Sequence, residues 1–307
     1  MLKSNRQTEW IEKKGIFLWL AFYFGGLGGG LFLFSLLFNN IWGMLAGWAI
    51  VAVLKGSSHM IDLGKPSRFW RLVFNARASW LSRGLIFVIA FIAVGFIQML
   101  VTYFFPGSVT EMILKIVSGS LSILVMGYTG LVLSKVKGVP LWKFPFLPLL
   151  FISCGLLSGF GVTQGISLIS GSVNLEFLVM VSRLLLTFTA LLLATYLIII
   201  WQKRDDELNS EFYRIKKGVS TVLLTLVVIL GILLPLAIAI NSLFVSGTNN
   251  FILISAIASE ILSGTIVDYY LLKSGVYNPI LISRQPEKYK LFPIQMATVG
   301  RKQPAAE

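Results

Sequence analysis

The chain has 307 residues, of which 56% are hydrophobic and only 13% are charged, and its net charge is +13. Several uninterrupted apolar segments reach about twenty residues, the length that an α-helix needs to cross a bilayer. This composition excludes a soluble globular protein and predicts an all-α integral membrane protein. The basic surplus is better explained by one membrane face than by nucleic-acid binding, which we do not expect.

Eight transmembrane helices are predicted in chain order, at residues 16–38, 42–61, 84–105, 112–134, 146–169, 177–201, 219–242 and 249–272. We expect one membrane domain over 1–307, built from two four-helix bundles at 16–134 and 146–272, with a polar tail at 273–307. The first apolar run is long enough to span the bilayer and stay there, so no cleavable signal peptide is expected.

The connections between these segments differ sharply in charge. Four of them, at 39–41, 106–111, 170–176 and 243–248, contain no Lys or Arg, whereas the opposite connections and both ends of the chain are rich in them. By the positive-inside rule, both termini and the 62–83 loop are predicted to lie in the cytoplasm.

Glycines mark the first predicted helix and the fifth. The first carries Gly25, Gly26, Gly28, Gly29 and Gly30, a spacing that lets helices approach closely in lipid. A nucleotide-binding loop is not favoured, because no strand precedes the glycines and no Lys-Ser/Thr follows them. A fainter echo in the fifth helix, at Gly155, Gly159, Gly161 and Gly165, hints at two related halves.

Residues 59–83, called here the motif segment, hold most of the unusual residue types of this apolar chain, including its only histidine. Lys55, His59 and Asp62 recur at i, i+4 and i+7 and therefore share one helix face. Such titratable groups at membrane depth favour a proton relay. In the alternative interpretation Lys55 extends to the membrane surface and Asp62 caps a turn.

A second polar set lies deeper in the predicted bundle. Arg183 and Glu260 differ in depth by roughly 6 Å at 1.5 Å per residue, and Asp268 follows two turns after Glu260. An ion pair between Arg183 and Glu260 and a proton path through Glu260 and Asp268 both fit this spacing. Gln98 and Gln164 are predicted to form interhelical hydrogen bonds.

Two tyrosines are candidates for ligand contact. Tyr128, in the Gly-Tyr-Thr-Gly sequence at 127–130, lies at the predicted level of His59, where a phenol can donate a hydrogen bond to a quinone carbonyl. Tyr23, just before the glycine run, is a lesser candidate on the same reasoning. Tyrosines are also common at membrane interfaces without any special role.

What the chain lacks limits its chemistry. One histidine cannot form a bis-histidine haem site, and the single cysteine, Cys154, excludes an iron–sulfur cluster bound by this chain alone. No hydrolase, Walker or zinc-protease motif is present. Any metal or flavin redox centre is therefore expected on a partner.

Residues 59–70 (HMIDLGKPSRFW), followed by 79–84 (SWLSRG), resemble the signature of the polysulfide reductase NrfD/PsrC family. The glycine-rich first helix and residues 127–130 are also similar to that family. The resemblance implies a membrane anchor without its own catalytic cofactor, in a multisubunit oxidoreductase of the kind used in anaerobic respiration. It implies exchange of electrons between a quinone pool, such as menaquinone, and an iron–sulfur subunit that is itself bound to a molybdopterin or other redox subunit.

Carried onto this chain, the resemblance implies quinone contacts from Tyr128 and from the turn between His59 and Asp62. The loop that follows is implied to dock the iron–sulfur partner, through Lys65, Arg68, Trp70, Arg71 and Arg77. Tyr23 and Arg83 are placed at the quinone site with departures from the family. Arg83 stands where some relatives carry a carboxylate, and an arginine cannot accept a proton. Proton acceptance is therefore expected from His59 or Asp62.

Orientation is a further departure, because several relatives present this motif to the outside whereas the charges here favour the cytoplasm. Rival functions also stay open. Buried Arg183, Glu260 and Asp268 suit a secondary transporter, or a proton-translocating protein without a redox partner. A purely structural anchor would need no titratable group within the membrane.

Overall fold

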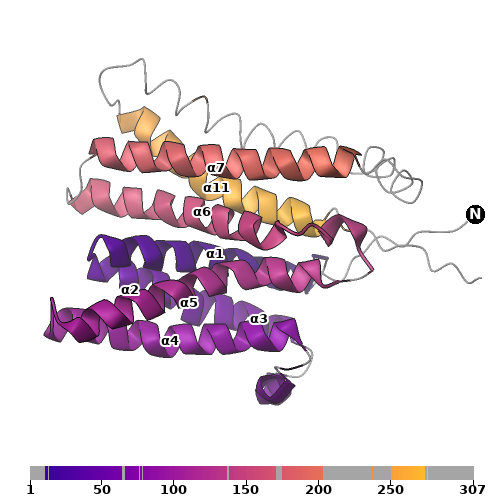
Figure 1. Ribbon diagram of the computed structural model, residues 1–307, viewed down its shortest axis with the longest axis horizontal. Helices are drawn as coiled ribbons and strands as arrows, with labels where there is room; N and C mark the ends of the chain where they lie inside the picture. The colour runs from indigo at the N-terminus through magenta and orange to yellow at the C-terminus, as the bar shows by residue number, and fades with distance from the viewer. Residues whose placement is uncertain are drawn as a thin grey trace, which may run out of the picture.

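Helices account for every regular element in the residues that the structure describes, which are 11–12, 14–63, 66–75, 77, 79–136, 138–170, 175–202, 237, 250–273 and 275. Figure 1 shows the computed structural model. The elements are α1 (Gly15–Leu37), α2 (Ile41–Ala49), the π-helix η1 (Ile50–Lys55), α3 (Gly56–Asp62), the 3-10 helix η2 (Pro66–Asn75), α4 (Trp80–Phe104), α5 (Val109–Ser134), the 3-10 turn η3 (Pro140–Trp142), α6 (Leu147–Ser170), α7 (Leu175–Gln202) and α11 (Asn250–Lys273).

Seven of the eight predicted segments are helical, with ends that agree to within about four residues. The segment predicted at 219–242 lies outside the described residues, apart from residue 237. The largest errors fall at the starts of α4 and α5, which the prediction placed too late. The Ser79 hydroxyl accepts a hydrogen bond from the Ser82 amide, and the Ser108 hydroxyl accepts one from the Glu111 amide. These serine caps begin each helix before its apolar run.

Six helical stretches are long and apolar enough to cross a bilayer: Gly15–Leu37, Ile41–Asp62, Trp80–Phe104, Val109–Ser134, Leu147–Ser170 and Glu176–Ile199. The second of these combines α2, η1 and α3 into one continuous helix with a π-helical middle. The predicted helix was regular throughout, because a π-helical turn leaves no mark in hydrophobic periodicity. These stretches make the chain a multi-pass membrane protein.

The helix α1 occupies the middle of the molecule. It packs against α2 and α5 on one side and against α6 and α11 on the other. Figure 1 shows α6, α7 and α11 above α1, with α2, α4 and α5 below it. Whether the whole chain forms two four-helix bundles stays a prediction.

Glycines bring α1 and α6 into backbone contact, as the sequence predicted. A Cβ atom on Gly30 would collide with the carbonyl oxygen of Gly155, and one on Gly159 would collide with the backbone of Gly30 and Leu31. Gly28 faces α2 in the same way, since its Cβ would lie 2.8 Å from the carbonyl oxygen of Gly47. In lipid, helices associate through such close packing rather than through the hydrophobic effect.

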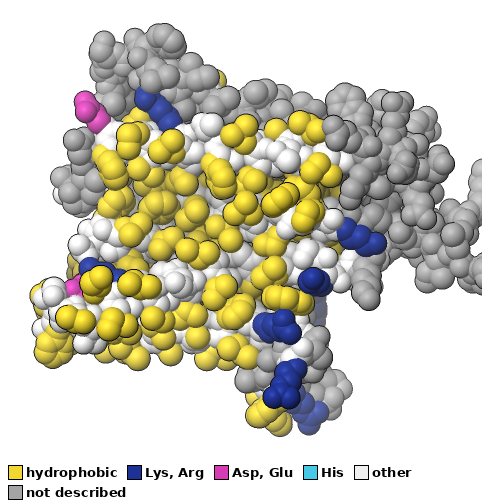
Figure 2. Space-filling model, in the orientation of Figure 1, with side chains coloured by type: hydrophobic (Ala, Val, Ile, Leu, Met, Phe, Trp, Pro, Cys, Tyr) yellow, Lys and Arg dark blue, Asp and Glu magenta, His cyan; other side chains and the backbone are white. Residues whose placement is uncertain are grey.

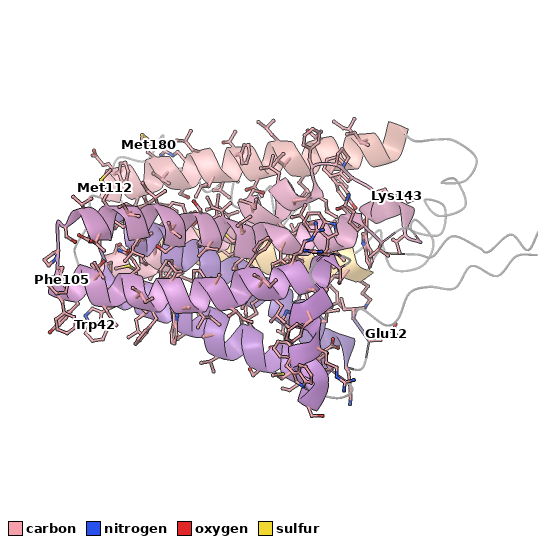
Figure 3. All side chains as sticks on the ribbon, turned by 60° about the horizontal axis from the view of Figure 1, so that its bottom comes forward. Glu12, Trp42, Phe105, Met112, Lys143 and Met180 are labelled. Atoms are coloured by element: carbon pink, nitrogen blue, oxygen red, sulfur yellow. The ribbon has the colours of Figure 1, made fainter. Side chains whose placement is uncertain are left out.

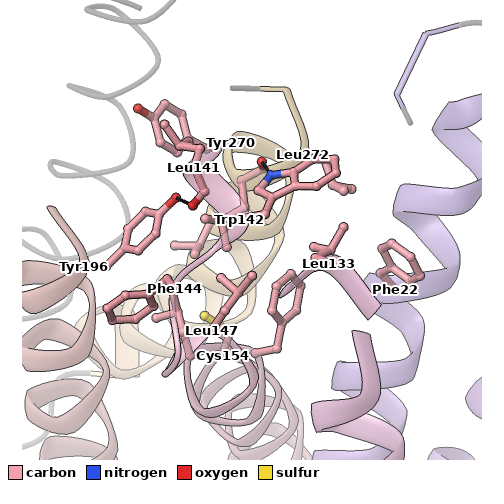
Figure 4. Packing of buried hydrophobic residues seen from close by; sticks show 14 of the residues in the cluster. Phe22, Leu133, Leu141, Trp142, Phe144, Leu147, Cys154, Tyr196, Tyr270 and Leu272 are labelled. Carbon is pink, nitrogen blue, oxygen red and sulfur yellow. Dashed lines mark hydrogen bonds between the residues drawn. The ribbon is translucent and has the colours of Figure 1, made fainter. Parts of the chain in front are cut away.

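A cluster of buried aromatic and aliphatic side chains holds η3 against α7 and α11 (Figure 4). The fully buried indole of Trp142 donates a hydrogen bond to the carbonyl oxygen of Leu271 over 2.7 Å. The Tyr196 hydroxyl donates to the carbonyl oxygen of Leu141 over 3.3 Å. The connection between α5 and α6 is therefore a packed part of the second half of the molecule.

Charge is distributed unequally between the two ends of the helices. On the face shown in Figure 2, Lys and Arg side chains gather at the end nearer the N-terminus. At the other end, Lys115 forms an ion pair of 2.9 Å with Glu111 and donates a hydrogen bond of 2.6 Å to Asn39. Arg183, in the first third of α7, also lies toward this end, so among the described residues the basic side chains are concentrated at the end nearer the N-terminus but are not confined to it. The orientation stays a prediction.

Replacing Gly30 with alanine should destabilise the protein, because its methyl group would push α1 away from α6. We expect a loss of roughly 1–3 kcal/mol, the usual cost of overpacking a tight interior. Thermal unfolding in detergent micelles measures it. Gly165→Ala is the matched control, since nothing lies within 4 Å of its added Cβ. Equal melting temperatures for the two variants would contradict the α1–α6 packing.

Candidate functional site

His59 of α3 and Tyr128 of α5 meet inside the bundle. The His59 Nε2 atom and the Tyr128 hydroxyl oxygen are 3.1 Å apart, a hydrogen bond whose direction depends on the histidine tautomer. Tyr128 is only 2% exposed. The sequence placed both residues at one membrane level, and the structure brings their side chains into contact.

The glycines of the two sequence motifs make room for this pair. A Cβ on Gly84, at the end of the 79–84 motif, would collide with the ring of Tyr128. In the Gly-Tyr-Thr-Gly motif, a Cβ on Gly130 would collide with Pro148, and one on Gly127 would lie 2.9 Å from Ile152. The three glycines therefore let α4 and α6 close around Tyr128 from both sides. Gly84 is not among the site residues predicted from the sequence.

Lys55 lies directly beside this pair. Its side chain is fully buried, and the Nζ atom donates a hydrogen bond of 2.8 Å to the carbonyl oxygen of Ala21 in α1. The same ammonium lies 4.7 Å from the centre of the Tyr128 ring, within the range of a cation–π interaction. The alternative in which Lys55 extends to the membrane surface is therefore wrong.

The helix α1 supplies the space and the remaining wall around Lys55. A Cβ on Gly25 would lie only 2.6 Å from the Lys55 Nζ atom, so the glycine leaves room for the ammonium. The ring of Phe22 packs edge-on against His59, with ring centroids 6.2 Å apart. Neither role is predicted from the sequence, although the glycine run indicates a close approach to this helix.

Two other predicted residues point elsewhere. The Tyr23 side chain hydrogen-bonds to Thr265 of α11 and interacts electrostatically with Asp268. Asp62 is half-buried and interacts with Lys14. Among the described residues, no hydrogen bond links Asp62 to His59 or Tyr128. Their predicted roles at the His59–Tyr128 pair stay predictions.

Asp268 connects the site to α11. It is 4% exposed, and it interacts electrostatically with Lys55 and with Tyr23. An uncompensated charge in the membrane interior is costly, so a buried lysine and a buried aspartate that interact in this way stabilise each other's charged forms. This electrostatic interaction links the continuous helix α2–η1–α3 to α11.

A second buried carboxylate, Glu260, lies between α6, α7 and α11. It accepts hydrogen bonds from the Ser182 hydroxyl and, over 3.2 Å, from the Gln164 side-chain amide. The interhelical bond predicted for Gln164 is thereby confirmed, whereas Gln98 donates to Thr102 within its own helix over 2.8 Å. The ion pair of Arg183 with Glu260 stays a prediction.

The predicted docking residues lie on the surface as far as they are described. Trp70, Arg71 and Arg77 are exposed; Lys65 and the side chain of Arg68 lie outside the described residues. Arg83 donates a hydrogen bond of 3.0 Å to the carbonyl oxygen of Arg77 and lies 4.5 Å from the ring of Trp80. These two interactions hold the Arg83 side chain against the last residues of the motif segment.

Figure 3 shows the side chains along the helices, with Glu12 and Lys143 labelled at the end that carries the site and Phe105 and Met180 at the other. No group of three or more His, Cys, Asp or Glu side chains with metal-binding potential occurs among the described residues. The site is thus an organic donor set consisting of an imidazole, a phenol and an ammonium.

A profile of the family described as polysulphide reductase, NrfD, matches residues 13–279. The chain belongs to the NrfD family. Members of the NrfD family are membrane subunits associated with quinone-linked oxidoreductases and generally partner with iron–sulfur and catalytic subunits. The match includes the three sequence motifs at 59–70, 79–84 and 127–130, which contain His59, Gly84 and Tyr128, respectively. A search of curated proteins found no match to the chain.

Proposed function

We propose that this NrfD subunit binds a quinone or quinol at His59, Tyr128 and Lys55 and passes electrons between the quinone pool and an iron–sulfur partner. The observation that carries the proposal is the 3.1 Å contact between His59 and Tyr128, with the Lys55 ammonium 4.7 Å from the Tyr128 ring. Quinone carbonyls accept hydrogen bonds, and the Tyr128 hydroxyl and the Lys55 ammonium can donate them, while His59 orients the Tyr128 hydroxyl. The donor set therefore fits a quinone.

When bound, a quinone of the menaquinone type supplies two-electron chemistry coupled to two protons. The chain's own residues hold the ligand and handle the protons. With its proton on Nε2, His59 donates to the Tyr128 oxygen and leaves the Tyr128 hydroxyl free to donate to a ligand carbonyl. The Lys55 ammonium stabilises negative charge on that carbonyl from close range, in a region without bulk water.

Proton transfer is proposed to start at His59, with Asp62 as the residue nearer the surface. The proposed path runs from Lys55 to Asp268 and then to Glu260, which lies two turns before Asp268 on α11. Arg183, next to the Ser182 that bonds Glu260, completes the proposed set. Buried ionisable groups in membrane helices are expensive and are commonly kept for such paths.

The iron–sulfur subunit, with a molybdopterin-type or other redox subunit bound to it, is proposed to dock on the motif segment. Arg77 is exposed there, at the end of the molecule where the basic side chains gather. A docked cluster would then lie at the same end of the helices as His59 and Tyr128. Electron transfer benefits from that short separation.

A secondary transporter is the rival function, favoured by the buried Glu260 with its serine and glutamine partners. The two functions differ in what accompanies the chain. A transporter is active as an isolated chain, whereas a quinone-reactive anchor purifies from native membranes with an iron–sulfur subunit and bound quinone.

Tyr128→Phe and His59→Ala should each abolish most quinol-linked turnover of the complex while dye-linked turnover of its soluble subunits stays intact. Removing a hydrogen bond that acts on developing charge typically costs about 100-fold or more in rate. Parallel assays with a quinol analogue and a soluble dye measure the two activities. Phe96→Ala, on the exposed face of α4, is the control. Unchanged quinol turnover in both site variants would refute the assignment.

Lys55→Met and Asp268→Asn should each destabilise the protein, because each removes the favourable electrostatic interaction of the other buried group. The double variant should recover part of that loss, with a coupling energy of roughly 0.5–3 kcal/mol. Thermal unfolding of the wild type, both single variants and the double variant completes the cycle. A coupling energy near zero would show that Lys55 and Asp268 do not depend on each other.

The orientation is proposed from the charge asymmetry, with both termini and the motif segment in the cytoplasm. Reporter fusions after Glu307 and within the 243–248 connection should report cytoplasmic and external positions, respectively. A third fusion in the 135–145 connection should agree with the one after Glu307. An external C-terminus would reverse the predicted orientation.

A further inference from the structure

The helix η2 presents an aromatic pair that the rest of the molecule leaves uncovered. Trp70 is 58% exposed and Phe74 is 82% exposed, and their rings contact each other edge-on with centroids 6.0 Å apart. Arg71 lies 5.4 Å from the Trp70 ring. Large aromatic side chains exposed together usually mark a surface that another apolar phase or molecule covers.

The position of η2 indicates that the membrane is the apolar phase that covers the pair. The helix packs against α4, and Figure 1 shows it end-on below α4, so that its axis runs across the membrane-spanning helices. A short helix that lies across the end of a spanning helix is parallel to the membrane plane. The neighbouring surface of α4 is apolar and exposed at Leu81, Ile86 and Ile89, as expected of lipid-facing side chains.

The charges near η2 also indicate that the membrane covers the aromatic pair. In Figure 2, hydrophobic side chains gather at the tip of this corner of the molecule, beside the Lys and Arg side chains that line the end of the helices. Arg71 and Arg77 are exposed here. Aromatic rings with adjacent basic side chains are the composition of helices that lie in the interface of an anionic membrane.

We propose that η2 is an interfacial helix, in which Trp70 and Phe74 insert between lipid chains and Arg71 contacts anionic phospholipid headgroups. The lipid surface, rather than the iron–sulfur partner, then covers the aromatic pair. The helix holds the motif segment against the bilayer at the end of α4, while Arg77 stays available to the aqueous side. This inference does not depend on quinone binding.

Spin labels on the purified chain in lipid nanodiscs test the proposal. Cys154 is the only cysteine and is buried, so Cys154→Ser provides a background for Trp70→Cys and Phe74→Cys. Ile89→Cys, exposed along α4, gives the hydrocarbon reference, and Lys143→Cys, exposed in the α5–α6 connection, gives the aqueous one. Accessibility to oxygen and to a water-soluble nickel complex reports the depth of each label.

Labels at 70 and 74 should be more accessible to oxygen than to the nickel complex, with depths between those of the two references. Labels as accessible to nickel as the one at 143 would overturn the proposal. So would labels that become shielded only when the other subunits are added, because a protein would then be the occupant. If a label perturbs η2, quenching of the Trp70 fluorescence by brominated lipids, taken as the difference between wild type and Trp70→Phe, gives a second measure.

The headgroup contact has its own readout. Replacing phosphatidylcholine with a mixture containing phosphatidylglycerol should deepen the label at 74, and Arg71→Gln should remove that response. If the label at 74 lies at the same depth in both lipid compositions, the proposed role of Arg71 is wrong. Failure of the quinol assays leaves these measurements unaffected, so the two proposals can fail separately.

Discussion

The backbone contact between α1 and α6 is the constraint on which the rest of the structure depends. Within lipid, the hydrophobic effect does not drive helices to associate. The two halves are therefore held together by close packing of helix surfaces that glycine leaves flat. At Gly30, Gly155 and Gly159 any side chain would separate the helices. Because α1 is held there, its first turns present the Ala21 carbonyl and Gly25 to Lys55 and present Tyr23 to α11.

Much of this architecture follows from the sequence, and the failures have identifiable physical causes. Apolar runs of bilayer length predicted seven helical segments that the structure shows, whereas the orientation predicted from the charges stays a prediction. The caps at Ser79 and Ser108 and the π-helix that ends at Lys55 leave no mark in the apolar pattern, so they are not predicted from the sequence. Counting residues from the ends of two predicted helices was enough to place His59 and Tyr128 at the same depth in the membrane.

The environment of Lys55 was beyond sequence reasoning for a different reason. The i, i+4 spacing correctly put Lys55 and His59 on one face, but a lysine near a helix end can reach either water or the interior. The interior position of Lys55 is stabilised by groups distant in sequence, namely the Ala21 carbonyl, the ring of Tyr128 and Asp268. A charge is buried only where such partners already exist, and only the tertiary structure reveals them.

The buried polar groups form two separate layers, and Asp268 extends the first of them into α11. The layer of His59, Tyr128 and Lys55 joins α3, α5 and α1, and the layer around Glu260 joins α6, α7 and α11. Asp268 interacts with Lys55 of the first layer, and it lies on α11 roughly 12 Å from Glu260 at 1.5 Å per residue. That distance exceeds any hydrogen bond, so a proton passing between the layers would need water or a side chain between them. In the proposed function, the contact of α1 with α11 is therefore where redox chemistry in the first half meets proton movement in the second.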